Sequence, residues 1–259
     1  GVALCVTGMG KVNSAMTLQA ILMDDRFDFS NAYIVSTGCA GSAIEYGVMG
    51  DVFVITATVD FDLGHHADAR DLTTDLATTW FHDESYDDAS AKLLNQELCE
   101  KVFNLVKDVQ IETTEKTRAF MAATFDNADW AIRDPKVLRG TTVTGDNYWK
   151  GMHDHANALL MTETYGCPDP YALTEMEDHA MSVVLDRLGM LDRYIIIRDS
   201  VNTDVFMNGA SPESLWDPNF VDSLASESSV ESADIFATAM KNNFTVGHVV
   251  IDAILNGEL

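Results

Sequence analysis

The sequence is poor in positive charge. Only 16 of its 259 residues are Lys or Arg, against 41 Asp and Glu, so the formal net charge is −25. An acidic surface repels the phosphates of nucleic acids and anionic lipid headgroups, and we therefore expect no nucleic-acid partner. The surplus is typical of a very soluble protein. Adaptation to high salt, which screens the self-repulsion, is a second interpretation.

Cysteines are few, and long apolar runs are missing. The four cysteines lie far apart without a Cys-x-x-Cys pair, so we expect buried free thiols, with a single disulfide as the alternative. No segment is long and apolar enough to span a bilayer, which argues against a channel or carrier formed by this chain alone. We expect neither a metal nor a cofactor.

The sequence begins abruptly with GVALCV, which predicts a buried strand without a polar lead-in. It contains no signal peptide as it stands. We therefore expect the natural chain to begin upstream of Gly1, and this chain to lack an N-terminal strand and loop. The compartment stays unassigned; a periplasmic or extracellular location would follow from an upstream signal peptide.

Short apolar runs alternate with helix-like segments along the chain. We expect strands at 2–6, 31–36, 51–59, 137–143 and 194–198, a strand and then a helix within 172–189, and helices at 12–23, 89–106, 152–162 and 233–255. This alternation predicts one α/β domain over residues 1–259, a three-layer sandwich with a twisted, mixed central β-sheet.

Ligands of such sheets gather where the strands end. Those ends fall at 7–10, 37–42, 145–149, 175–177 and 199–204. The first two, TGMG and STGCAGS, are predicted small-residue turns whose N–H groups can approach an anion or hydroxyl, although ordinary tight turns have the same composition. Neither fits the dinucleotide fingerprint or the P-loop spacing.

The other strand ends carry aromatic and polar side chains. Tyr148 and Trp149 could stack on a flat heterocycle or pack in the core. In the triplet EME, Glu177 can accept two hydrogen bonds from a vicinal diol, or serve as an ordinary charge at a helix N-terminus. In IIIRDSVNTD several polar side chains directly follow a buried strand. A solvated loop without a function would have the same composition.

These pieces together resemble the nucleoside phosphorylase and nucleosidase family, and more closely its purine nucleoside permease branch. The resemblance is carried, in the family's order, by TGMGKVNSAM, by STGCAGSA followed by GDVFV, and by TGDNYWKG, TEMED and IIRDSVNTD. It covers most of the chain, and the combination is more specific than any single motif. It implies a single α/β domain that cleaves purine nucleosides at the N-glycosidic bond.

The resemblance also implies roles for individual residues. Those matched to substrate binding are Met9 beside the ribose, the turn Cys39, Ala40 and Gly41 against base or phosphate, Tyr148 stacked on the base with Trp149 beside it, and Met176 with Glu177 on the ribose. Arg198 precedes by four residues the base-recognition position, Asn202. An Asn there can donate a hydrogen bond to purine N7 or O6 but cannot protonate it, and Asp199 or Asp204 are the alternative acids.

Two departures from the family pattern concern the acceptor. Ser36 stands where phosphate-using members carry Arg, and Cys39 stands where they carry Ser; Arg70, His65 or His66 could substitute. Further catalytic residues of the family would lie before Gly1. The acceptor is therefore water or phosphate as co-substrate, and the resemblance implies a homo-oligomer in which a neighbouring chain can complete the site. Alternatives to an enzyme are a non-catalytic nucleoside-binding protein that assists uptake, and a relative that has lost its chemistry.

Overall fold

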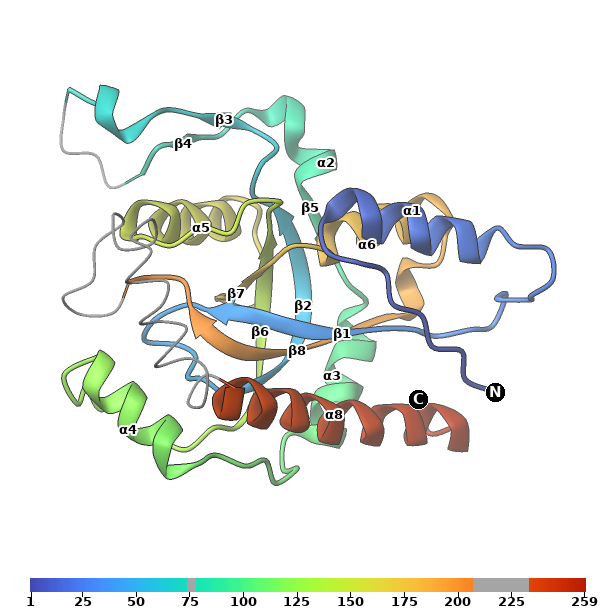
Figure 1. The fold of residues 1–259 in the computed structure, drawn as a ribbon. Coiled ribbons are helices and arrows are strands. Elements are labelled where there is room, and N and C mark those ends of the chain that lie inside the picture. The colour runs from blue at the N-terminus through green and yellow to red at the C-terminus, as the bar shows by residue number, and fades with distance from the viewer. Residues whose placement is uncertain (74–77, 207–232) are drawn as a thin grey trace.

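A six-stranded mixed sheet forms the centre of the computed structural model, which describes residues 1–73, 78–206 and 233–259. The strands are β1 (Ile34–Ser42), β2 (Val52–Asp60), β5 (Ala91–Leu93), β6 (Val137–Thr144), β7 (Tyr171–Glu175) and β8 (Tyr194–Thr203). Their order is β5-β2-β6-β7-β1-β8, and β8 also pairs with β2, so the sheet curls back on itself (Figure 1). The pairs β1–β8, β2–β6 and β6–β7 are parallel.

Helices cover both faces of this sheet. On one face, α1 (Lys11–Leu22) and α6 (Asp178–Arg187) pack against a core that includes Phe53 and Ile196. On the other, α3 (Gln96–Val106) and α8 (Ala233–Asn256) pack against a core that includes Val52 and Ile197. Consecutive strand residues point to opposite faces, so these continuous apolar strands are buried on both sides. The predicted single α/β domain with a mixed sheet is confirmed.

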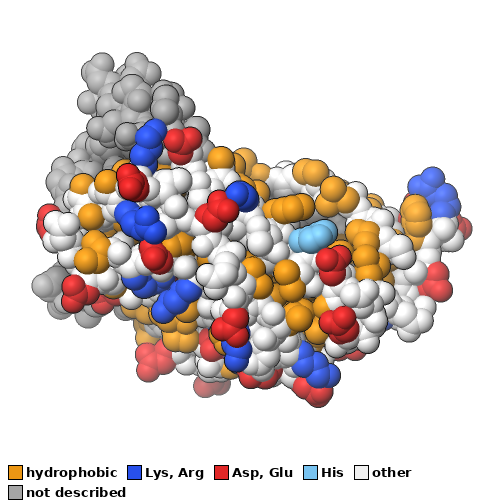
Figure 2. Space-filling model, turned by 90° about the horizontal axis from the view of Figure 1, so that it is seen from below, with side chains coloured by type: hydrophobic (Ala, Val, Ile, Leu, Met, Phe, Trp, Pro, Cys, Tyr) orange, Lys and Arg blue, Asp and Glu red, His pale blue; other side chains and the backbone are white. Residues whose placement is uncertain are grey.

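Smaller elements complete the fold. They are α2 (Asp87–Ser90), α4 (Glu115–Thr124), α5 (Met152–Thr164), the hairpin β3 (His65–His66) and β4 (Trp80–Phe81), and short 3₁₀ turns at Ala69–Asp71, Glu84–Tyr86 and Leu191–Arg193. Along α8 the side chains of Phe236, Phe244 and Leu255 are exposed, and apolar side chains gather on the face of the molecule seen in Figure 2. Within the described residues, no helix has the length and apolarity needed to cross a membrane.

The predicted strand at 2–6 is wrong. Residues 1–8 have no regular structure, and Val2, Leu4 and Val6 are 63%, 94% and 88% exposed. A strand needs a neighbour that satisfies its N–H and C=O groups, and none of the described strands pairs with this segment. An apolar composition alone therefore does not make a segment form a strand.

Three further predictions need new boundaries. The predicted turn at 37–42 is strand, because β1 continues through it in register with β8, which likewise runs past 198 to Thr203. The predicted helix at 89–106 is confirmed only from Gln96: residues 91–93 pair with the edge of β2, and the Asn95 side chain caps the helix by accepting from Leu98 N–H. The helix α4 was not predicted. The other predicted helices and strands are confirmed.

Candidate functional site

Four charged side chains meet at the connection between β7 and α6. We call them the Arg198 cluster: Arg198, Glu175, Glu177 and Asp178. Glu175 ends β7, Glu177 precedes α6, Asp178 is the first residue of α6, and Arg198 reaches them from the middle of β8. Their side chains are between 0% and 15% exposed, so the ionic contacts lie largely out of water.

Every nitrogen of the Arg198 guanidinium donates a hydrogen bond. Nε and Nη2 donate to the two oxygens of Asp178 at 2.9 and 2.6 Å, a bidentate pair. Nη2 also donates to Glu177 at 3.2 Å and to Glu175 at 3.3 Å, while Nη1 donates to the carbonyl of Cys39 at 3.2 Å. Arg198 therefore fixes these carboxylates and β1 relative to one another.

The cluster shifts the pKa of two of its members. Burial alone would lower the pKa of Arg198, but the carboxylates of Asp178 and Glu175 hold it well above its usual value. Burial, with the Asp178 carboxylate beside it, raises the pKa of Glu175 to about 7. Glu175 also accepts from the backbone N–H groups of Glu177 and Asp178, at 2.5 and 2.8 Å, so it organises the start of α6.

The N-terminus of α1 docks on the exposed side of the cluster. Gly10 N–H donates to Glu177 Oε1 at 2.9 Å, and Lys11 N–H donates to Asp146 at 2.8 Å. These carboxylates satisfy two of the free N–H groups at the start of the helix and interact favourably with its dipole. The Lys11 ammonium lies 2.9 Å from Asp60 and 2.8 Å from Asp62. The structure thus joins the predicted strand ends 7–10, 145–149 and 175–177.

Two glycines of β1 make room for side chains from β8. Gly38 pairs with Arg198 and Gly41 with Asn202 across the parallel ladder. A Cβ atom on Gly38 would lie 2.5 Å from Arg198 Nη1, and one on Gly41 would lie 2.5 Å from Asn202 Oδ1. The small-residue pattern of STGCAGS therefore reflects close approach of two polar side chains to a strand, rather than a turn.

The remaining predicted substrate residues lie around these elements. Met9 and Tyr148 are exposed at 70% and 62%, and Met176 is half-buried. Ala40 is buried, and Cys39 is partly exposed on β1. Trp149 is buried and stacks on Phe61, with the ring centroids 5.0 Å apart, so it packs in the core beside Tyr148.

The side chains of Asp199 and Asp204 form hydrogen bonds outside the Arg198 cluster. Asp199 lies on the α8 face of β8, where it accepts from Asn243 at 2.5 Å, and burial raises its pKa to about 6. Asp204 is buried, with His155 at 2.6 Å and the Tyr171 hydroxyl at 2.9 Å. Neither is a partner of the Arg198 cluster, so both hold the fold together around the site.

The suggested substitutes for a phosphate-binding Arg are occupied elsewhere. Arg70 is largely exposed and pairs with its neighbour Asp68 at 2.5 Å. His66 Nε2 lies 2.8 Å from the carbonyl oxygen of Phe61, and His65 lies 3.8 Å from Asp83. Ser36 is buried and donates to Asp178 at 3.2 Å, behind the cluster.

Sequence reasoning missed the role of Asp178 and the acidic partners of Lys11. Asp178 lies in the first turn of α6, where an acidic side chain is favoured, and it is also the main partner of Arg198. The useful signal was the acidic run EMED, because three carboxylates beside a buried strand need a buried cation. Asp60 is the last residue of β2 and Asp62 lies two residues beyond it, at a strand end outside the five predicted ones.

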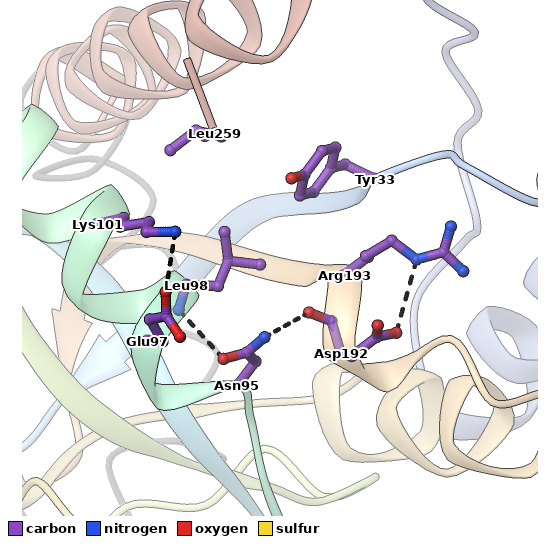
Figure 3. Close-up of a pocket in the computed structure, with 8 residues that line it drawn as sticks. All are labelled: Tyr33, Asn95, Glu97, Leu98, Lys101, Asp192, Arg193 and Leu259. Atoms are coloured by element: carbon purple, nitrogen blue, oxygen red, sulfur yellow. Dashed lines mark hydrogen bonds and ion pairs between the residues drawn. The ribbon is translucent and has the colours of Figure 1, made fainter. Parts of the chain in front are cut away.

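A pocket of about 240 Å³ lies at the opposite end of the sheet. It is lined by residues that precede β1 and β8, such as Tyr33 and Arg193, and by the start of α3 (Figure 3). Its charged side chains pair among themselves: Lys101 lies 3.0 Å from Glu97, and Arg193 lies 3.6 Å from Asp192. It holds none of the predicted site residues, and we assign it no role.

Comparison with solved structures places the fold. The chain superposes with a TM-score of 0.55 on a 5'-methylthioadenosine/S-adenosylhomocysteine nucleosidase from Neisseria meningitidis, at 17% identity over 96% of this chain and 79% of that one. The futalosine hydrolase of Helicobacter pylori gives a TM-score of 0.53 at 14% identity, over 95% and 77% of the two chains. At these identities the likeness shows a shared fold.

Comparison with protein sequences shows the family. A probable purine nucleoside permease of Schizosaccharomyces pombe is 28% identical over 76% of this chain and 63% of its own length. The purine nucleoside permease of Candida albicans is 24% identical over 74% and 52%. The chain thus spans less than two thirds of the length of these relatives. The family model described as purine nucleoside permease (NUP) matches residues 1–258, and the chain belongs to that family.

Proposed function

We propose that the chain binds purine nucleosides and cleaves the N-glycosidic bond between ribose and base. The observation that carries this proposal is the placement of Glu177. Its carboxylate is partly exposed, is held by Arg198 at 3.2 Å, and lies beside the N-terminus of α1. A carboxylate fixed in this way can accept hydrogen bonds from two neighbouring sugar hydroxyls. The nucleosidase-like fold and the family both agree with a nucleoside ligand.

The other residues then take distinct roles. Asn202, whose side chain is set against Gly41, would donate a hydrogen bond to N7 or O6 of the purine and stabilise the negative charge that develops on the departing base. Tyr148 is exposed and free to stack on the base, and Met9 and Met176 would pack on the ribose. Arg198 acts through Glu177, because its N–H groups already donate within the protein.

Bond cleavage follows from these contacts. As the C1′–N bond lengthens, ribose becomes cationic and the base becomes anionic. The Arg198 cluster, which carries a net negative charge, stabilises the cationic ribose. Asn202 stabilises the anionic base. An acceptor held below C1′ completes the reaction, and holding it there removes much of the entropic barrier.

The test is release of free base from inosine by the Glu177→Ala variant. We expect kcat/KM to fall about 100-fold, the equivalent of losing a charge-assisted hydrogen bond of about 3 kcal/mol. The matched control is Glu97→Ala, which removes a carboxylate that is 80% exposed on α3 and should leave turnover unchanged. Parent-like turnover by Glu177→Ala would show that the site lies elsewhere.

A second candidate is a nucleoside-binding protein with little turnover. It is favoured by the permease names of its curated relatives. Micromolar binding of inosine by calorimetry without any release of base would support this candidate over the enzyme.

A further inference from the structure

We infer that the acceptor at this site is water, and that inorganic phosphate is excluded by the charge of the site. The inference rests on the proposed function and adds the identity of the second substrate. It starts from a count of cations. All 16 Lys and Arg residues lie in the described part of the chain, because residues 74–77 and 207–232 contain none.

Three of these cations lie at or next to the strand ends that form the site: Arg198 and Lys11 are paired with carboxylates, whereas Lys150 directly follows Trp149 and forms no ion pair with a described residue. Arg198 serves three carboxylates, and Lys11 lies within 3 Å of both Asp60 and Asp62. Burial would lower the pKa of Lys11, but hydrogen bonds to Asp62 and Asp60 raise it, so the ammonium stays charged within its own acidic pair. Neither Arg198 nor Lys11 has charge to spare for an anion.

Carboxylates outnumber cations throughout this region. The side chains of Arg198 and Lys11 pair with five carboxylates, and the backbone N–H of Lys11 donates to a sixth: in order, Asp60, Asp62, Glu175, Glu177 and Asp178, and then Asp146. The region stays negative even when Glu175 carries a proton. A phosphate ion would enter this field with one or two further negative charges, and partial burial weakens the screening that could offset the repulsion. A water molecule meets no such barrier.

The strand that faces the site supplies no compensating donor with positive charge. Ser36 is buried and donates its hydroxyl to Asp178. Burial raises the pKa of the Cys39 thiol, and the nearby Asp199 raises it further, so Cys39 is a neutral, weak donor. Residues 36–41 therefore offer polar atoms suited to a neutral acceptor rather than to an anion.

Lys150 is the cation that tests this inference most directly. It lies on the loop of Tyr148 and Trp149, and no carboxylate of the described residues forms an ion pair with it. Burial lowers its pKa to about 8, and Asp204 is the charge that acts on it. Among the described residues, Lys150 is therefore the cation to test for recruitment of phosphate to the site.

The hydrolysis balances without another reactant. The C1′–N bond breaks and its electron pair stays on the purine nitrogen, while the water oxygen bonds to C1′. The proton that the water loses equals the one that the departing purine takes up. Nucleoside and water therefore give ribose and free purine base.

The experiment incubates the purified chain with inosine in ¹⁸O-labelled water at 0, 5 and 50 mM phosphate, with chloride added to constant ionic strength. Chromatography and mass spectrometry follow hypoxanthine, ribose and ribose 1-phosphate. We expect ¹⁸O in the ribose, no ribose 1-phosphate, and a rate that changes less than twofold with phosphate. The Lys150→Met variant should respond to phosphate in the same way as the parent.

Each other outcome has a defined meaning. Ribose 1-phosphate formed in proportion to phosphate would overturn the inference while leaving nucleoside cleavage intact, and its loss in Lys150→Met would identify the anion-binding residue. Absence of hypoxanthine in every condition would overturn the proposed function, and the inference with it. As a readout independent of turnover, phosphate should raise the melting temperature no more than chloride of equal ionic strength.

Discussion

Arg198 and Asp199 are neighbours on β8, and they meet opposite environments. Arg198 faces α6 and donates to three carboxylates, whereas Asp199 faces α8, has a single amide partner in Asn243, and leaves Oδ2 without a partner among the described residues. Both side chains are at least 95% buried. The comparison shows that burial alone does not decide the charge of a side chain: the partners on each face do.

The two pKa shifts express this difference. Carboxylates around Arg198 raise its pKa and so stabilise the charged form, even though burial opposes it. Burial raises the pKa of Asp199 to about 6, which favours the neutral acid. On the α6 face of β8 the surroundings thus stabilise the charged form of Arg198. On the α8 face they favour the neutral form of Asp199. The proposed nucleoside site lies on the side that keeps charge.

Arg198→Met is expected to have the largest effect on the stability of the protein. It removes the cation and leaves three carboxylates buried together, so we expect the free energy of unfolding at pH 7 to fall by about 3–5 kcal/mol. Urea denaturation followed by circular dichroism measures the change. Arg198→Lys is the matched control, and it should lose less because it keeps the charge but not the bidentate geometry. Equal stability of Arg198→Met and the parent would mean that the cluster is not buried.

Asp199→Asn is expected to raise the free energy of unfolding, whereas Arg198→Met lowers it. The pKa of Asp199 is about 6 in the folded protein, against an ordinary value of 3.8, so the folded state binds the proton more tightly. Folding stability therefore falls as the pH rises from about 4 to above 6. The neutral Asn escapes this cost, and we expect Asp199→Asn to be about 1–2 kcal/mol more stable than the parent at pH 8, with little difference at pH 4. A variant less stable than the parent at pH 8 would contradict this assignment.

Gly41→Ala adds a single methyl group to β1 and is expected to have the smallest effect on stability. Its Cβ would meet Asn202 Oδ1 at 2.5 Å, and this flexible side-chain end can rotate away, so the expected loss of stability is below about 1 kcal/mol. Base release from inosine should nonetheless fall about tenfold, because Asn202 loses its position. Asn202→Ala is the matched variant, with a similar loss that is larger for inosine than for adenosine. Unchanged inosine turnover in both variants would remove Asn202 from the site.

Most of the fold was predictable because its apolar runs are continuous. Strands such as β2 and β6 are buried on both faces, and that pattern can be recognised from the sequence alone. The strand predicted at 2–6 failed because pairing depends on a neighbour that a local pattern does not reveal. The extension of β1 to Ser42 was missed because glycines there suggested a turn, whereas their reason is contact with β8.

The location of the candidate site was predictable, but its connectivity was not. Glu177 and the segment 7–10 were expected to meet at one edge of the sheet, and they do, although residues 1–8 form no strand and reach that edge as the lead-in to α1. The partners of Arg198 could not be assigned, since three carboxylates within four residues are equally near along the chain. Which of them pairs depends on how α6 leaves β7. The same three-dimensional geometry turns Asp199 away from the site.

The amide proton of Gly10 is a reporter of occupancy at Glu177. In the free protein it is engaged with Glu177 Oε1 at 2.9 Å, near the surface. A ligand hydroxyl that takes over this oxygen releases the proton to solvent, whereas most ligand contacts protect the amides they cover. Gly10 should then exchange with deuterium faster in the bound state than in the free one, while the amides of β8 keep their rates. Binding of a nucleoside would thus be detected as faster hydrogen–deuterium exchange at the Gly10 amide.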